Sequence, residues 1–420
     1  MATENKKYIP TFRFPEFQND GKWKEYPLGQ IFSRITKRNS VNNQNVLTIS
    51  AQYGLISQYD YFNKNVAAID VSNYYHISKY DFAYNKSKSQ GYPYGAIKPL
   101  KLYEDGVVSP LYICFRIKDD RSFVNTFFEY YFESGLIHKE IDKISQEGAR
   151  NHGLLNISTK DFFDKIILYI PSFWEQKKIA DCLVSIDKEI DAAKRKLDLL
   201  KEHKKGLMQR LFPAKGKTIP ELRFPEFKND GEWQIVSLGE ITSVVKRRNK
   251  SNRSLPIYSI NNAEGFVPQS QQFAGMDSEA RGYDISAYKI IGKHTFAYNP
   301  ARINVGSIGY SGELKDILIS SLYVCFKAVE NVDDDFLMCF FNSYIFNQAV
   351  ESNVEGGIRS YLFYENFSRI SIAIPSLYEQ KRIASCVTSI EDMIKKSNEQ
   401  ISLLETHKKG LLQQLFPMIK

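Results

Sequence analysis

The chain has 420 residues, of which 43% are hydrophobic and 25% charged, and its formal net charge is +8. This length suits two or more domains, and the excess of basic residues mildly favours a polyanion such as nucleic acid as a partner. No apolar run reaches the roughly 18 residues that a membrane span needs, and the polar first ten residues lack a secretory signal. We therefore expect a cytoplasmic protein that makes no contact with a membrane.

Neither the cysteines nor the histidines are spaced as metal ligands. The five cysteines lie mostly within apolar runs and contain no C-x-x-C pair, and the six histidines show no ligand spacing. We expect reduced, buried thiols, no disulfide framework and no metal site.

Two stretches of the chain occur twice. Residues 9–31 and 219–241 are identical at more than half of their positions, and residues 170–213 and 374–417 at about half. Between these blocks the halves share only landmarks, such as FAYN at Phe82–Asn85 and Phe296–Asn299. Common ends with different middles favour one frame that holds two different recognition domains. The alternative is that the middles drifted freely as surface.

The repeat predicts the domain boundaries. An N-terminal segment (1–21) precedes a first recognition domain (22–171) and a first long helix (172–213). A linker (214–231) then leads to a second recognition domain (232–375) and a second long helix (376–420).

Each middle alternates apolar and polar residues in short runs, such as NVLTISAQYGLIS in the first half and SLPIYSINNAEGF in the second. This period of two is typical of strands, and aromatic-rich helical segments follow before a last strand. We predict an α+β protein with two mixed α/β target-recognition domains. Their sheets should be twisted and largely antiparallel, and two long helices should join them.

Each shared C-terminal block predicts one long helix. Ser172 and Glu175 have the spacing of a capping box, which Ser376 and Glu379 repeat. Apolar residues then alternate steps of four and three, which is the heptad pattern of a coiled coil. The residues that we expect to pair the helices are Ile179, Leu183, Ile186, Ile190, Leu197 and Leu200 in the first copy and Ile383, Val387, Ile390, Ile394, Ile401 and Leu404 in the second.

Two such helices in one chain most simply pair with each other as an antiparallel coiled coil. This pairing would relate the halves by a pseudo-twofold axis and would space the two recognition domains. Lys204 and Lys205, followed by Gly206, favour a helix C-terminus at this point. The alternative is an ordinary amphipathic helix packed on its own domain, which a sustained 3.5-residue period makes the weaker interpretation.

Basic and polar residues cluster in corresponding connections of both middles. Arg, Lys and Asn at such places bind phosphates or read base edges in the major groove. Any single charge run is more often a solvated loop, but runs at paired places in two repeats favour a shared surface. The candidate DNA-binding residues are Lys37, Arg38, Lys86, Lys88, Arg150 and Asn151 in the first half and Lys246, Arg247, Arg248, Arg253, Arg302, Asn304 and Arg359 in the second.

The sequence contains no catalytic constellation. A G-x-x-x-x-G-K-[ST] phosphate loop and a glycine-rich dinucleotide fingerprint are both absent. Asn299-Pro300 lacks the second proline and the aromatic residue of an adenine methyltransferase motif. We therefore predict that this chain has no catalytic residues and binds no cofactor of its own.

IPSFWEQKKIA at 170–180 and IPSLYEQKRIA at 374–384, with FAYN and S-x-LY-x-CF as weaker support, resemble the DNA-specificity subunits of type I restriction–modification systems. The resemblance covers the whole chain. It implies that each recognition domain reads one half of a split target in double-stranded DNA, and that the subunit itself catalyses nothing. It also implies two adenine-N6 methyltransferase subunits that bind S-adenosylmethionine, and restriction subunits that translocate DNA with ATP and Mg²⁺.

Two other classes stay open at this point. One is a free-standing DNA methyltransferase or nuclease with an unrecognised active site. The other is a coiled-coil scaffold, which predicts no sequence-dependent DNA binding.

Overall fold

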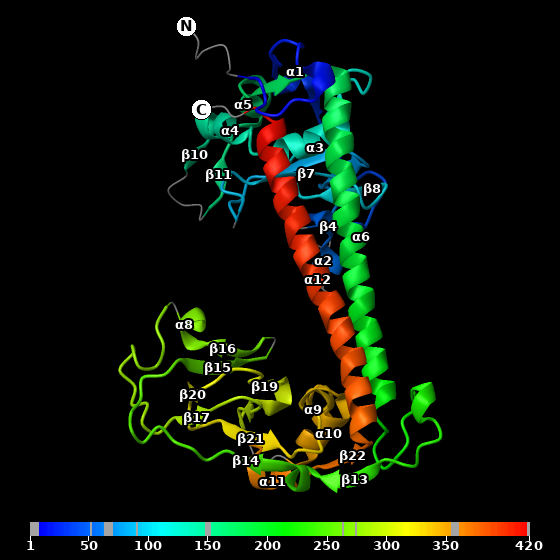
Figure 1. Cartoon of the computed structure of the whole chain (residues 1–420). Helices are drawn as coiled ribbons and strands as arrows, with labels where there is room; N and C mark the ends of the chain where they lie inside the picture. The colour runs from blue at the N-terminus through cyan, green and yellow to red at the C-terminus, as the bar shows by residue number, and fades with distance from the viewer. Residues whose placement is uncertain are drawn as a thin grey trace. The chain divides into compact units, whose positions relative to one another are not determined.

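The computed structural model describes residues 8–50, 53–62, 70–89, 91–147, 153–262, 264–273, 275–353 and 361–417. The chain divides into two compact units, the first comprising residues 1–193 and 400–420 and the second residues 194–399. Each unit contains one of the two predicted recognition domains, which we call reader 1 (residues 22–171) and reader 2 (residues 232–375). Each unit also contains a part of both long helices, α6 (Phe173–Leu211) and α12 (Leu377–Leu415) (Figure 1).

Reader 1 is built around two sheets. The first has four antiparallel strands in the order β2 (Phe32–Arg34), β9 (Ile113–Ile117), β6 (Phe82–Asn85) and β7 (Ala96–Pro99). The second consists of two antiparallel pairs, β3 (Leu47–Ser50) with β4 (Gly54–Ser57) and β5 (Tyr75–Ser78) with β8 (Asp105–Val108). A parallel bridge between Val46 and Val107 joins these two pairs.

Short helices and peripheral strands complete reader 1. The strands are β1 (Lys24–Pro27), paired with β12 (Ile167–Ile170), and β10 (Gln146–Glu147), paired with β11 (Leu155–Asn156). The helices are α1 (Leu28–Ile31), α2 (Gln58–Phe62), α3 (Asn125–Glu133), α4 (His138–Ile144) and α5 (Thr159–Asp164).

Reader 2 repeats this plan. Its first sheet has the order β14 (Thr242–Val244), β21 (Val324–Ala328), β18 (Phe296–Tyr298) and β19 (Ile308–Tyr310). Its second has the order β16 (Gly265–Pro268), β15 (Ile257–Asn261), β20 (Ile317–Ile319) and β17 (Lys289–Ile291). The peripheral pair is β13 (Gln234–Ser237) with β22 (Ser371–Ile374), and the helices are α7 (Leu238–Ile241), α8 (Gln269–Gln272), α9 (Asp334–Phe341), α10 (Tyr344–Asn353) and α11 (Tyr364–Ser368).

The two readers therefore share one topology although their sequences have diverged. The first sheet of each reader is antiparallel throughout, and the second sheet of reader 2 contains one parallel pair, β15–β20. The predicted α+β class with two mixed, largely antiparallel recognition domains is confirmed.

The end of each long helix closes the core of one unit. In unit 1, Leu415 and Phe416 at the end of α12 are buried in the main core, where the ring of Phe416 lies 5.6 Å from that of Phe127. In unit 2, Leu211 and Phe212 at the end of α6 are buried in the equivalent core. The repeated L-F-P motif is therefore a core-forming element, which explains why it occurs twice.

The repeated R-F-P-E-F segment is fastened to a long helix by a buried ion pair. Arg13 donates two hydrogen bonds to the carboxylate of Glu175, at 2.8 and 2.6 Å, and Arg223 does the same to Glu379, at 2.8 Å each. The side chains of both glutamates are only 1% exposed. This clamp anchors the start of each half to the helix that follows its reader.

The glutamine beside each clamp glutamate binds backbone. The Gln176 side-chain oxygen accepts a hydrogen bond from the backbone N–H of Val124, which precedes α3, and its amide donates to the carbonyl of Pro171. Gln380 makes the equivalent bonds to Asp333 and Pro375. The E-Q pair of each I-P-S-x-x-E-Q-K motif is thus structural in both halves.

Two local predictions about the long helices are wrong. Both helices continue through Gly206 and Gly410 to the L-F-P motif, because the residues after each glycine still bury an apolar face on a reader core. That burial outweighs the roughly 1 kcal/mol that glycine costs in a helix. The capping boxes are also incomplete: Ser172 accepts from the Glu175 N–H, but the Glu175 carboxylate bonds to Arg13 instead of returning to the cap.

The two long helices contact each other in both units. In unit 1 the Lys408 ammonium lies 2.7 Å from the Asp187 carboxylate, and in unit 2 that of Lys204 lies 2.6 Å from the Glu391 carboxylate. A later position on one helix thus meets an earlier position on the other, so the pairing is antiparallel, as predicted. Lys204 therefore binds the other helix and does not cap its own.

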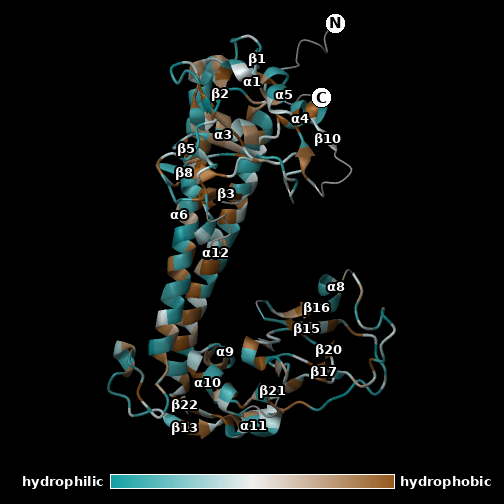
Figure 2. Ribbon diagram, turned by 180° about the vertical axis from the view of Figure 1, so that it is seen from behind, coloured by the Kyte–Doolittle hydropathy of each residue, from teal (hydrophilic) through white to brown (hydrophobic). Residues whose placement is uncertain are grey.

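The predicted seam is removed from water along its length. Ile179, Leu183, Ile190, Leu197, Ile383, Val387, Ile390 and Ile401 are buried, and Ile186, Leu200, Ile394 and Leu404 are half-buried. Figure 2 shows hydrophobic segments, in brown, at intervals along both helices, which are otherwise mostly hydrophilic. At the start of α6, Ile179 and Leu183 belong to the reader 1 core. The start of α6 therefore packs on its own domain, as the alternative interpretation of an amphipathic helix predicts.

All five cysteines lie among the described residues, and none forms a disulfide. Burial raises the pKa of the Cys114, Cys325 and Cys339 thiols to about 12 in each case, which keeps them protonated and unreactive near neutral pH. Within the described ranges, no helix is long and apolar enough to cross a membrane.

Candidate nucleic-acid interface

The basic loops of each reader leave the same edge of its four-stranded sheet. In reader 1, β2 and β6 both pair antiparallel with β9 and therefore run parallel to each other. Their following segments, which carry Lys37 and Arg38 after β2 and Lys86 and Lys88 after β6, emerge at one edge. In reader 2, β14 and β18 have the same relation to β21, so Lys246–Asn249 and Arg302 also emerge together.

A buried asparagine braces the first basic loop in both readers. In reader 1, Asn39 donates to the Asn43 carbonyl at 2.9 Å and accepts from the Asn43 N–H at 2.8 Å. In reader 2, Asn249 makes the same two bonds to Arg253, at 2.9 Å each. The residue before the bonded position, Asn42 or Asn252, has a φ of 52° or 47°, a left-handed conformation that asparagine tolerates. The loops are thus equivalent turns with different exposed residues.

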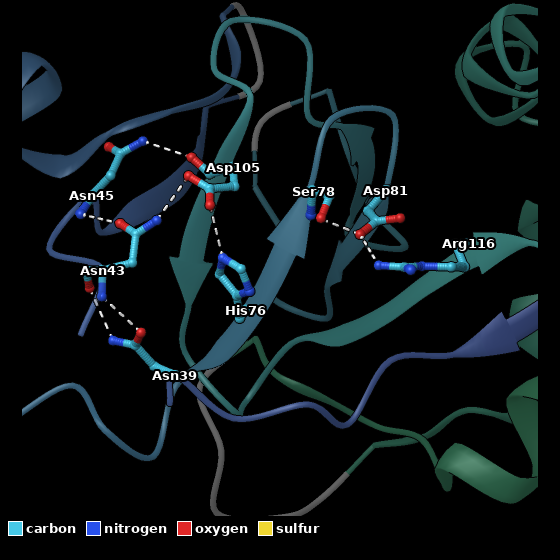
Figure 3. A network of polar contacts seen from close by, with 8 residues as sticks. All are labelled: Asn39, Asn43, Asn45, His76, Ser78, Asp81, Asp105 and Arg116. Carbon is cyan, nitrogen blue, oxygen red and sulfur yellow. Dashed lines mark hydrogen bonds and ion pairs between the residues drawn. The ribbon is translucent and has the colours of Figure 1, made fainter. Parts of the chain in front are cut away.

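In each reader, an aspartate contacts a residue of the braced turn. In reader 1, Asp105 accepts a hydrogen bond from the Asn43 side chain at 2.8 Å and lies 3.0 Å from the His76 ring nitrogen (Figure 3). Asn45 also donates to the Asp105 carbonyl, at 3.0 Å. In reader 2 the equivalent residue is Asp316, whose carboxylate lies 3.7 Å from the Arg247 guanidinium and 3.8 Å from that of Arg253.

A second, smaller network joins the end of β5 to β9 of the first sheet (Figure 3). Asp81 accepts from the Ser78 N–H at 2.7 Å and from Arg116 at 2.6 Å. Burial raises the pKa of Asp81, and these bonds oppose that effect. Asp105, Asp316 and Asp81 were not among the predicted site residues, because an isolated aspartate beside a turn carries no sequence signal without its partners.

The predicted residues of the first loop are solvent-exposed. Lys37, Arg38, Lys246, Arg247, Arg248 and Arg253 are all exposed. Arg38 donates to the Asn73 carbonyl, and its guanidinium lies 4.7 Å above the Tyr75 ring centroid. Arg248 is the equivalent residue of reader 2. Its backbone pairs with that of Lys289, as the backbone of Arg38 pairs with that of Tyr75. Lys289 is thus a further cation at this surface, and its place inside a strand hides it from a search for basic loops.

In both readers, the segment that follows β6 or β18 is hydrogen-bonded to a later part of the same reader, residues 153–155 or residue 362. The N–H of Lys88 donates to the Gly153 carbonyl at 2.7 Å, and that of Leu155 donates to the Lys86 carbonyl at 3.1 Å. In reader 2, the N–H of Leu362 donates to the Pro300 carbonyl at 3.1 Å, next to the exposed Arg302 and Asn304. Arg150, Asn151 and Arg359 lie outside the described residues.

The arrangement offers positive charge and hydrogen-bond donors. Over the described ranges, no group of three or more His, Cys, Asp or Glu residues is placed to hold a metal ion. Exposed Arg, Lys and Asn side chains on rigid turns at one sheet edge can bind phosphates and read base edges.

The comparisons with known proteins agree on one family. The sequence model of the type I restriction modification DNA specificity domain matches residues 230–405. The type I restriction enzyme MjaVIII specificity subunit of Methanocaldococcus jannaschii is 25% identical over 280 residues, which are 61% of this chain and 62% of that protein. The specificity subunit ascribed to enzyme MjaX of the same organism is 23% identical over 314 residues, 71% of this chain and 69% of the relative.

Solved structures show the same fold. The crystal structure of the type I restriction–modification S subunit from M. genitalium has a TM-score of 0.55 at 13% identity and covers 98% of this chain and 100% of that one. The HsdS subunit from Thermoanaerobacter tengcongensis has a TM-score of 0.50 at 13% identity, with 96% and 100% coverage. Residues 230–405 thus match the DNA specificity domain of type I restriction–modification systems, and the fold of the whole chain is that of solved S subunits.

Proposed function

We propose that this chain is a non-catalytic specificity subunit whose two readers each recognise one half of a bipartite target in double-stranded DNA. One observation carries this proposal: both readers present exposed basic residues on the same asparagine-braced turn, at the same sheet edge, yet with different residues at that surface. A common scaffold with different contact residues is what two half-sites of different sequence require.

We further propose that the chain directs two methyltransferase subunits and restriction subunits to that target. S-adenosylmethionine, ATP and Mg²⁺ would then belong to these partners, and a cytoplasmic location stays a prediction. Support for a repeated partner comes from exposed positions that are identical in both helices. Leu199 and Leu403 are 66% and 71% exposed. A leucine side chain that faces solvent buries little apolar surface and therefore adds little to the stability of the chain.

The glycine seven residues after each of these leucines lacks an internal explanation. A Cβ added at Gly206 or Gly410 would meet nothing within 4 Å, so the chain itself does not require glycine there. Two copies of one partner helix, one on each long helix, would explain both the exposed leucine and the missing side chain, because small residues permit close helix packing.

Replacing Gly206 and Gly410 with alanine is therefore expected to have opposite effects on the chain and on the complex. Each change should stabilise the isolated chain by about 0.5–1 kcal/mol, since alanine favours helix over glycine. The same changes should weaken co-purification of the methyltransferase subunit encoded beside this chain. Urea unfolding and a pull-down would measure the two effects, and stabilisation with undiminished binding would remove this surface from the proposal.

The proposed function is tested by letting the purified chain, alone and with its methyltransferase subunit, select duplexes from a random-sequence pool. We expect one enriched motif with two specified halves and a gap of fixed length. Methyl transfer from S-adenosylmethionine should require the second subunit. Enrichment of no motif would overturn the recognition proposal, and methylation by this chain alone would favour a free-standing enzyme.

Changing Arg247, Arg248 and Arg253 together to alanine should remove the base preference in one half of that motif and leave the preference in the other half intact. Removing a side chain that reads a base edge costs ~1–3 kcal/mol, whereas removing one that binds a phosphate lowers affinity and salt dependence together. The matched variant in reader 1, Lys37→Ala with Arg38→Ala, should affect the opposite half. Unchanged affinity and salt dependence in both variants would show that these runs are solvated loops.

A further inference from the structure

One apolar side chain projects into solvent at the same place in both readers. Leu111, in the S-P-L-Y turn of reader 1, is 72% exposed, and Leu322, in the S-S-L-Y turn of reader 2, is 75% exposed. Each turn is held by its serine. The Ser109 hydroxyl accepts from the Leu111 N–H at 3.3 Å, and the Ser320 hydroxyl accepts from the Leu322 N–H at 3.4 Å. The leucine is therefore presented on a rigid turn.

Both turns lie at the sheet edge from which the basic loops emerge. Leu111 precedes β9, whose first residue, Ile113, pairs with Tyr84 near the end of β6. Continuing this register carries Leu111 and Lys86 to the same edge of the sheet. In reader 2, Val324 pairs with Tyr298, so Leu322 reaches the same edge as the loop that carries Arg302.

A cation binds the turn of reader 2. The Lys289 ammonium donates to the carbonyl of Tyr323, the residue next to Leu322. Burial raises the pKa of the Tyr323 hydroxyl, and the nearby positive charge of Arg302 partly offsets this rise. An exposed leucine next to a residue that binds a lysine fits a partner with both negative charge and apolar faces. Duplex DNA has phosphates on the outside and stackable bases within.

The leucine is common to two readers whose braced turns differ at exposed positions, such as Ser40 and Val41 against Lys250 and Ser251. A residue that distinguished bases would be expected to differ between readers of different half-sites, as the residues of the braced turns do. Contact with a thymine methyl group would require the same base at that place in both halves. Insertion between stacked base pairs makes no such demand, because every base has an apolar face.

We propose that Leu111 and Leu322 are wedge residues, each of which inserts between neighbouring base pairs of the half-site that its reader contacts. This inference rests on the proposed function. The basic loops at the same sheet edge would hold nearby phosphates, and the wedge would partly unstack one base step and so favour half-sites that deform easily.

The test uses the full chain with its methyltransferase subunit and the duplex that the wild-type protein selects from a random pool. Single 2-aminopurine substitutions are placed along both halves, since this base becomes brighter when it is unstacked. The wild type should brighten one position in each half. Leu322→Ala should abolish the signal in the half read by reader 2 only, and Leu111→Ala in the other half only.

Each alanine variant should also bind the selected duplex at least about tenfold more weakly, with an unchanged dependence of affinity on salt, because the groups that bind phosphates stay in place. Leu102→Ala is the matched control in reader 1. Leu102 is 61% exposed in the turn after β7, at the opposite edge of the same sheet, and this change should alter neither signal nor affinity. Leu322→Met, which keeps a long apolar side chain, should restore both.

The outcomes separate the wedge from the function on which it rests. Failure to select any duplex overturns the proposed function. A selected duplex that Leu111→Ala and Leu322→Ala bind and brighten as the wild type does overturns the wedge alone. Weaker binding by these variants without any wild-type brightening also overturns insertion, because the leucines would then contact base edges in an undistorted groove.

Discussion

A fragment comprising residues 1–215 is expected to form a homodimer that recognises an inverted repeat of one half-site. The fragment contains reader 1 and all of α6 but lacks residues 400–417. In the full chain, those residues supply Leu415 and Phe416 to the core of unit 1. Without them the fragment exposes the buried faces of Trp23, Phe127 and Tyr131, whose rings lie 5.6–6.0 Å from the Phe416 ring.

The fragment also carries a replacement for the part that it lacks. The end of α6 has the same L-F-P motif, and Phe212 fills the equivalent position in unit 2, where its ring lies 5.4 Å from that of Phe336 and 6.1 Å from that of Phe340. In two copies of the fragment, each α6 end can therefore enter the vacant core of the other copy. Such an exchange gives a closed, twofold dimer.

Sedimentation at micromolar concentration would measure the association. Phe212→Ala within the fragment is the matched control, because removing a buried phenylalanine costs about 3–5 kcal/mol and Phe212 has no role inside its own copy. We expect this variant to be monomeric or to aggregate. A wild-type fragment that stays monomeric and folded would show that reader 1 does not need the L-F-P insertion.

The sequence predicts the frame of this protein better than its contacts. The heptads and the two I-P-S-x-x-E-Q-K blocks predict the long helices, because periodic apolar residues and helix starts are local signals. The error at Gly206 has the opposite cause. Local propensity favours a stop there, but the residues beyond the glycine bury Met208 and Leu211 in a core assembled from distant segments.

The candidate interface likewise has one part that the sequence predicts and one part that it does not. Runs such as Lys246–Asn249, which ends in the asparagine that corresponds to Asn39, are visible as charge in the sequence. The brace that these asparagines form, however, depends on hydrogen bonds to turns whose left-handed residues, Asn42 and Asn252, carry only a weak sequence signal. Asp105 and Asp316 are remote in sequence from these turns and could not be placed without the fold.

The second large effect is expected from breaking the clamp between Arg223 and Glu379. Their side chains are 9% and 1% exposed, and two parallel hydrogen bonds of 2.8 Å join them. Glu379→Ala would leave a buried guanidinium without its counter-charge, which costs about 3–5 kcal/mol. Urea unfolding should show this loss, and amide hydrogen exchange should rise most in residues 219–241, the segment that the clamp holds.

The same segment provides a control. Glu226, three residues after Arg223, pairs with Arg382 at 3.2 Å, but these side chains are 44% and 49% exposed. Because water screens this pair, Glu226→Ala should cost at most about 1 kcal/mol. Replacing both clamp residues, Arg223→Met with Glu379→Leu, removes the buried charges together and should recover most of the stability that Glu379→Ala loses. If Glu379→Ala were no worse than Glu226→Ala, the repeated R-F-P-E-F segment would be held by its aromatic contacts instead, and the ion pair would be dispensable for fastening each half to its helix.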